Sequence, residues 1–111
     1  MHEETRQQRQ AQRRAYELLG QLIERGEREN LPVITWVLAS ANTQAILTGD
    51  CEAADPIQRQ ADFEAWKKSL GAEAWPNGIR SEAGIRLSAS TVDPSEEVTI
   101  TLSAFIANDE M

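Results

Sequence analysis

The chain has 111 residues, of which 41% are hydrophobic and 26% charged, and its 18 acidic and 11 basic side chains give a net charge of −7 at pH 7. A chain of this length and composition is typical of one globular domain and is too short for two. The acidic balance disfavours nonspecific binding to nucleic acid or to anionic membranes.

We therefore expect residues 1–111 to form a single domain. No apolar run approaches the ~20 residues that a membrane-spanning helix needs, and the N-terminus lacks the apolar stretch of a secretory signal. Cys51 is the single cysteine, so no disulfide can form within the chain. These features predict a protein of the cytoplasm that has no membrane attachment.

A long amphipathic helix is predicted at the N-terminus. Residues 3–29 contain no proline, and apolar residues recur at helical spacing, namely Ala11, Ala15, Leu18, Leu19 and Leu22. Gly26 and Asn30 are helix-stop signals, and Pro32 prevents the helix from continuing.

The same helix carries the one basic strip of the chain. Arg6, Arg9 and Arg13 fall opposite the apolar stripe, and Arg14 follows them. Arg13 stands four residues before Glu17, which is the spacing of an ion pair on a helix surface. The strip is therefore interpreted first as a solvated helix face.

A β-hairpin is predicted next. Residues 33–39 are rich in β-branched and aromatic side chains and follow Pro32, which indicates a strand. Residues 44–48 form a second, shorter apolar run that ends at Gly49. The small polar run 40–43 between them is expected to hold the turn.

A second helix is predicted over residues 56–70. Asp55 is placed to cap it, Pro56 suits its first position, and Gln58 stands where a capping-box partner is expected. Gly71 is a C-terminal stop signal. Its buried face is expected to consist of Phe63, Trp66 and Leu70.

The last two strands show the clearest pattern in the chain. In residues 85–91 and 98–106 apolar side chains alternate with polar ones, which is typical of half-buried strands. Asp93 and Pro94 begin a four-residue segment, 93–96, that suits a type I turn. Residues 75–78 also have turn chemistry and are expected to lie in a loop.

The expected fold is therefore an α+β two-layer sandwich with the order α-β-β-α-β-β. Its four-stranded antiparallel sheet carries both helices on one face, which buries all the apolar stripes together. The other face is left polar. Residues 1–8 and 107–111 are expected to be frayed, and the expected core comprises Leu18, Leu22, Phe63, Trp66, Ile85, Leu87, Ile100 and Leu102.

No catalytic, metal-binding or cofactor-binding residue is predicted. Cys51 lacks a base, because the only histidine, His2, lies in the segment expected to fray. One cysteine and one histidine cannot supply a structural zinc site. The glycines form no phosphate-binding pattern, and the carboxylates of Asp50, Glu52 and Asp55 match no calcium loop.

The candidate functional residues are instead candidates for an interface. Val33, Val37 and Phe105 point away from the predicted core, and their combination predicts a small apolar patch on the outer sheet face. Trp75 lies in a loop, where tryptophan serves either as a core cap or as a partner contact. Arg9 and Arg13 represent the basic helix face.

The leading functional hypothesis is a nonenzymatic protein-interaction or regulatory module without a cofactor. Its partner would be another protein or a second copy of the chain, with a homodimer favoured over a monomer. One alternative is a small-molecule-binding or catalytic domain with a pocket between helices and sheet. The other is a DNA-contacting regulator that uses the arginine helix, although nucleic acid is an unfavourable partner for an acidic body.

Two segments, NLPVITWV (residues 30–37) and RQADFEAWK (residues 59–67), carry a resemblance. Across roughly residues 10–106 the chain resembles a family of small actinobacterial proteins of uncharacterised function. Some of these proteins are linked to mobile elements or regulatory loci. The resemblance implies a bacterial cytoplasmic accessory protein and assigns no functional residue.

Overall fold

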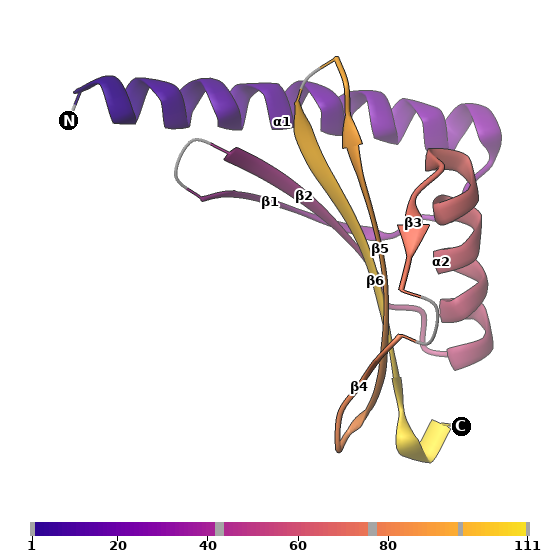
Figure 1. The fold of residues 1–111 in the computed structure, drawn as a ribbon. Coiled ribbons are helices and arrows are strands. Elements are labelled where there is room, and N and C mark those ends of the chain that lie inside the picture. The colour runs from indigo at the N-terminus through magenta and orange to yellow at the C-terminus, as the bar shows by residue number, and fades with distance from the viewer. Residues whose placement is uncertain (1, 42–43, 76–77, 96, 111) are drawn as a thin grey trace.

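The computed structural model of the chain describes residues 2–41, 44–75, 78–95 and 97–110 (Figure 1). Two helices and six strands follow one another in the order α1 (His2–Glu29), β1 (Thr35–Ala41), β2 (Gln44–Cys51), α2 (Pro56–Leu70), β3 (Glu73–Ala74), β4 (Ile79–Arg80), β5 (Gly84–Asp93) and β6 (Val98–Ala107). A short 3-10 helix, η1 (Asn108–Glu110), ends the described chain.

The predicted α+β class is confirmed, whereas the four-stranded antiparallel sheet is wrong. The sheet has six strands in the order β1-β2-β6-β5-β3, and β4 also pairs with β5. The β2–β6 pair is parallel, and all the other pairs are antiparallel. The two predicted hairpins are therefore present but are joined through their second strands.

The two additional strands have a topological cause. After β2, helix α2 carries the chain back along the sheet, so residues 72–83 must run the length of β5 before β5 itself begins. They do so as an edge strand broken into β3 and β4, in a segment that turn chemistry predicted as a loop. Of that predicted turn, Pro76 and Asn77 lie outside the described residues.

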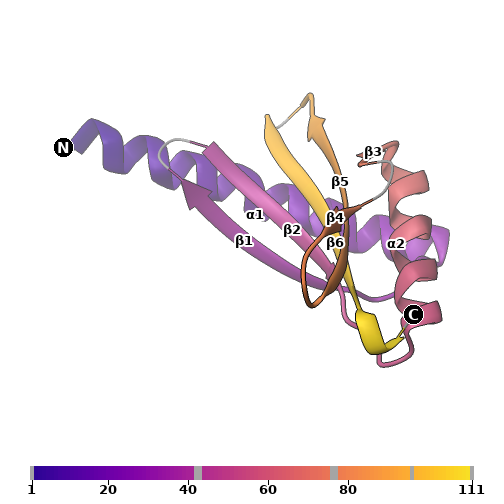
Figure 2. The same ribbon diagram turned by 60° about the horizontal axis from the view of Figure 1, so that its bottom comes forward.

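Both helices pack on the same side of the sheet around one core. Helix α1 lies against β1, β2 and β6, while α2 lies against β6, β2 and β5. Figure 2 shows α1 running lengthwise along the first hairpin and α2 standing beside the second. The buried apolar residues are Ala11, Ala15, Leu18, Leu22, Ala45, Leu47, Cys51, Phe63, Trp66, Ala89, Val98, Ile100, Leu102 and Ala104.

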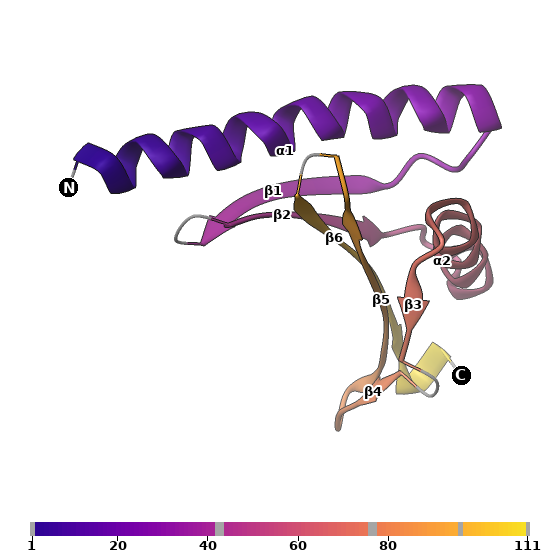
Figure 3. The same ribbon diagram turned by 45° about the horizontal axis from the view of Figure 1, so that its top comes forward.

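This core confirms most of the predicted one, with Leu87 only partly buried. Ile85 is an exception, since it lies near the far end of β5 opposite Ile106 and is not part of the core cluster. That end of the hairpin extends away from α1, as Figure 3 shows. Alternation alone cannot reveal where along a strand the covering helix ends.

The other face of the sheet has no covering layer among the described elements. It carries Val37 of β1, Thr48 of β2, and the Ser, Thr and Phe105 side chains of β6, in keeping with the alternation of strand side chains. On this face Arg86 donates a hydrogen bond to the Ser103 hydroxyl over 2.8 Å and lies over the Phe105 ring.

The ends of α2 follow the sequence signals closely. The Asp55 side chain accepts a hydrogen bond from the Ile57 amide, and Gly71 adopts the left-handed conformation with φ of 64°. Gln58 differs from its expected capping role, because its side-chain amide donates to Asp62 one turn further on. Asp62 is buried, and this bond satisfies one of its carboxylate oxygens.

The C-terminal residues, expected to be frayed, are held against α2. The Arg59 guanidinium contacts both carboxylate oxygens of Glu110, at 2.9 and 3.0 Å, and also donates to the carbonyl oxygens of Ala53 and Phe105. Residues 2–8, which were also expected to be frayed, belong to helix α1, which begins at His2.

The turn predicted over residues 93–96 includes Glu96, which lies outside the described residues. Next to it, the Glu97 amide donates a hydrogen bond to the Asp93 carbonyl.

No helix in the described ranges is both long and apolar enough to cross a membrane.

Candidate functional site

The one thiol of the chain is poorly suited to catalysis. Cys51 is buried at the end of β2. Burial, together with the negative charges of Asp62 and Asp50, raises the pKa of this thiol to about 12. A thiol with that pKa is almost entirely protonated at neutral pH, and the thiolate is the nucleophilic form. The side chain of His2 lies outside the described part of the structure.

Clusters of metal ligands give no site either. Within the described residues, no group of three or more His, Cys, Asp or Glu side chains is placed to hold a metal ion. Asp55 is engaged as the helix cap of α2.

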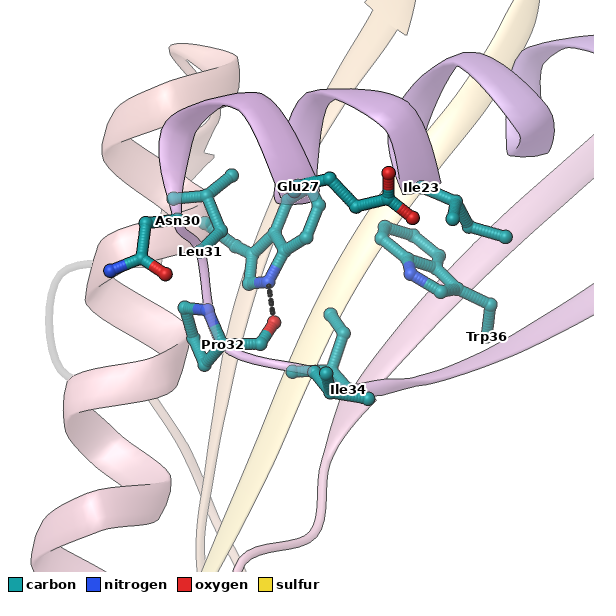
Figure 4. A pocket seen from close by; sticks show the side chains of 10 residues that line it. Ile23, Glu27, Asn30, Leu31, Pro32, Ile34 and Trp36 are labelled. Carbon is teal, nitrogen blue, oxygen red and sulfur yellow. Dashed lines mark hydrogen bonds between the residues drawn. The ribbon is translucent and has the colours of Figure 1, made fainter.

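An apolar concavity lies where α1 ends and the chain enters β1 (Figure 4). It has a volume of about 410 Å³ and is open on one side. Trp36 and Trp66 form part of its wall and meet edge to face, with ring centroids 5.3 Å apart. The Trp66 indole nitrogen donates to the Pro32 carbonyl over 2.8 Å, which ties the connecting segment to α2. The remaining lining residues are Ile23, Gly26, Glu27, Asn30, Leu31, Pro32, Val33 and Ile34.

Two glycines border this concavity, and one of them is required for its shape. A Cβ atom at Gly49 would lie 2.8 Å from Ile34 and 2.9 Å from Trp36, so β2 must be bare there for both side chains to lie across it. At Gly26 a Cβ atom would lie 3.4 Å from the Trp66 ring, which is an ordinary van der Waals contact. The absence of a Cβ atom is therefore required at Gly49, where the backbone approaches an aromatic ring most closely.

The sheet edge beside the concavity is unusual in its lack of charge. Strand β1 ends the sheet and pairs only with β2 among the described strands. Residues 31–49, which include β1, contain no charged side chain and no proline after Pro32. The opposite edge is divided into two two-residue strands that carry Glu73 and Arg80. Short, charged strands protect an edge from pairing, whereas β1 has none of this protection.

Helix α1 presents a largely uncharged flank on the same side as this edge, with Glu27 beside its C-terminal end. Ile23 and Gly26 line the concavity with Ile34 and Trp36, while Gln21 and Arg25 face Ile100 on the other side of the helix. Successive residues of a helix are rotated by about 100°, so the α1 residues on the β1 side fall within one arc of roughly 80° around the helix axis. It consists of Thr5, Gln8, Gln12, Tyr16, Leu19, Ile23 and Gly26.

We call this combined region the β1-edge surface. It comprises the free edge of β1, the α1 residues Tyr16, Leu19 and Ile23, and the concavity residues Val33, Ile34 and Trp36. Tyr16 is 62% exposed and Ile23 is 50% exposed, and Val33 is almost fully exposed. Apolar side chains gathered at this exposure along an unpaired edge are characteristic of binding surfaces.

The candidate residues from the sequence fall in different places. Val33 lies in the β1-edge surface, although it precedes β1 rather than standing in it. Arg9 is exposed on α1. Arg13 is also exposed and forms the predicted ion pair with Glu17 at 3.2 Å, which is confirmed, while its guanidinium lies over the Tyr16 ring.

Val37 and Phe105 share the uncovered sheet face but do not meet. Val37 is on β1 and Phe105 on β6, with β2 between them, and the register sets Val37 level with Thr101 across that strand. Trp75 is 64% exposed at the other edge, beside β5. The structure therefore gathers no single patch from Val33, Val37 and Phe105.

Five named residues of the surface were not among the candidates, namely Tyr16, Leu19, Ile23, Ile34 and Trp36. Leu19 belongs to the apolar stripe of α1, and Tyr16 and Ile23 stand on the shoulder of that stripe. One sequence signal could have pointed to this surface: residues 31–49 carry no charge in a chain that is 26% charged. Only the strand order reveals that this run forms an edge.

No protein-family model matches the chain, and neither a curated protein nor a solved structure shows significant similarity to it.

Proposed function

We propose that the chain is a nonenzymatic protein-interaction module that binds a protein partner through the β1-edge surface. The observation that carries the proposal is the free, uncharged edge of β1 beside exposed Tyr16 and Ile23. Such an edge offers unpaired backbone donors and acceptors to any extended segment unless a partner strand occupies it. A regulatory accessory role in a bacterial cytoplasm is part of this proposal.

The DNA-contacting alternative is less well supported. Arg13 is paired with Glu17, and Arg6 lies 4.0 Å from Glu3. Arg14 turns to the other flank of α1, where it lines a concavity with Glu97 and Thr99. The basic strip is therefore divided and partly neutralised, which weakens the counterion release that drives binding to phosphates.

The experiment replaces single residues by the photo-crosslinking amino acid p-benzoylphenylalanine in cells that produce the protein. At Val37 or Tyr16, irradiation should yield a discrete adduct with a protein. Matched control positions are Ile57 on α2 and Ile79 on β4, which are 78% and 48% exposed. These two positions should yield no adduct.

An adduct of any defined protein, the chain itself included, supports the proposed function. Absence of adducts at Val37 and Tyr16, or equal labelling at all four positions, contradicts it. The comparison discriminates because both control positions are at least as exposed as Val37, at 47%, but lie elsewhere on the molecule.

The small-molecule alternative is favoured by one observation, the apolar concavity of about 410 Å³. Ligand pockets commonly start at roughly 300 Å³ and are lined by aromatic side chains. A bound apolar molecule would shift the indole NMR signals of Trp36 and Trp66 in a saturable way. Ile34→Trp, which fills the concavity, should abolish that shift, and a screen of small apolar compounds that gives no saturable shift contradicts this alternative.

A further inference from the structure

Resting on the proposed function, we infer that the occupant of the β1-edge surface is a second copy of this chain. The two β1 strands would pair antiparallel about a twofold axis and join the two sheets into one. The two α1 helices would then lie side by side on the same face of the joined sheet. A twofold interface uses the same surface on both copies, which suits a strand edge that is complementary to itself.

The position of α1 matches this arrangement. Helix α1 packs mainly against β1 and β2, the two strands nearest the free edge, and less against β6. Neighbouring strands are only about 4.8 Å apart. Pairing β1 with its symmetry mate would therefore make the two α1 helices neighbours on the same face of the joined sheet, with their β1-side flanks facing each other.

The side chains that would meet between the helices are the uncharged ones. The flank of α1 on the β1 side has Leu19 near its middle, with Tyr16 and Ile23 on either side. An antiparallel arrangement centred near Leu19 brings Leu19 against the same residue of the second copy and Tyr16 against Ile23. The exposed Tyr16 and Ile23 side chains would thereby become buried, while Glu27, which also lines the concavity, lies towards the C-terminal end of the helix.

The charges along α1 favour the antiparallel direction. Residues 1–14 carry four arginines and two glutamates, whereas residues 15–29 carry four glutamates and two arginines. In an antiparallel pair the basic half of each helix lies along the acidic half of the other, which is the complementary arrangement. The first turns of α1, which project beyond the β1–β2 hairpin in Figures 1–3, would also gain a neighbour.

The size of the surface sets the expected affinity. Seven strand residues span about 23 Å, and the sheet and helix layers together are about 20 Å high, which gives roughly 500 Å² on each copy. Two such faces reach about 1,000 Å², the lower limit for a specific interface. We therefore expect a dimer that dissociates in the micromolar range.

Sedimentation equilibrium of the purified chain tests the inference. The wild type should show a concentration-dependent mass between monomer and dimer. Val37→Lys and Ile23→Lys place a charge on the two parts of the interface and should each weaken dimerisation at least tenfold. Val92→Lys is the matched control, since Val92 is 60% exposed but lies on β5, and it should leave the dimer intact. Circular dichroism checks that each variant is folded.

A second measurement locates the contact directly. Val37→Cys should give a covalent dimer with a short bifunctional thiol reagent, whereas Val92→Cys should not, and buried Cys51 leaves the background low. A monomer mass at all concentrations up to about 1 mM, or a dimer unaffected by both lysine variants, would overturn the inference. If the wild type is monomeric while Val37 still crosslinks to another protein in cells, the second-copy inference fails and the proposed function stands.

Discussion

At the scale of single residues, two glycines have opposite roles. Gly84 begins β5 against the end of β6, and a Cβ atom there would collide with the Ile106 carbonyl oxygen and lie 2.8 Å from the Ala107 Cα atom. Gly20 lies on the exposed side of α1 with no atom within 4 Å of such a Cβ. The first glycine is required by packing, while the second only adds flexibility to a helix.

We predict opposite effects for the two alanine substitutions. Gly84→Ala should destabilise the protein by about 2 kcal/mol or more, since both colliding atoms belong to the backbone of a paired strand. Gly20→Ala should stabilise it by about 0.5–1 kcal/mol through the higher helix propensity of alanine. Urea denaturation measures both values, and a stabilising Gly84→Ala would show that the β5–β6 register is wrong.

The tryptophans show what residue-level reasoning can and cannot predict. The helical spacing of Phe63, Trp66 and Leu70 correctly places Trp66 in the core. Nothing local shows that its indole nitrogen bonds to Pro32, 34 residues earlier in the chain. The local sequence also gives no sign that Trp36 meets the Trp66 ring to form the wall of a concavity. Contacts of this range depend on the strand order.

At the scale of elements, an ion pair helps to hold the 3-10 helix η1 against α2. Arg59 on α2 and Glu110 on η1 form hydrogen bonds that lower the pKa of Glu110 to about 2, with the Ala107 amide as a second donor. The ordinary value for this carboxyl is 4.5. Because the folded-state pKa lies below the unfolded one, the pair stabilises the fold above about pH 4.5 and loses its effect as the pH falls toward 2.

We predict that Glu110→Gln lowers stability at neutral pH and that this difference shrinks on acidification. The wild type and the variant should converge between about pH 4.5 and pH 2, as the wild-type carboxylate becomes protonated. Thermal melts across this range provide the measurement. Glu82→Gln, at an exposed position, is the control and should follow the wild type. A constant gap between wild type and Glu110→Gln at every pH would contradict the role assigned to the ion pair.

Element prediction from the sequence succeeds where local chemistry decides and fails where topology does. Asp55, Pro56 and Gly71 fix the ends of α2, and the alternation in residues 98–106 identifies β6. The parallel pairing of β2 with β6 depends on which hairpin strands become neighbours, which no local pattern encodes. The broken strand formed by β3 and β4 follows from that pairing and from the direction in which α2 returns the chain.

At the scale of the whole molecule, the two edges of the sheet differ in how well they are protected from pairing with another strand. The β5 side is covered by short strands with charged residues, whereas β1 runs for seven residues without charge. The structure has principal extents of 49 × 35 × 22 Å, and its long dimension agrees with the length expected for the 28-residue α1, about 42 Å. Both the free edge and the largely uncharged helix flank run along this long side.

Amide hydrogen exchange of β1 tests the central claim most directly. Every second amide of an edge strand points away from its neighbour and exchanges rapidly when nothing pairs with it. If a partner strand occupies the edge, all amides of Thr35–Ala41 should be protected at high protein concentration, and every second one should lose protection on dilution or in Val37→Lys. The account would be contradicted if those outward amides exchanged rapidly at every protein concentration. The same rapid pattern would then be seen in Val37→Lys and in cell extract that contains the natural partners.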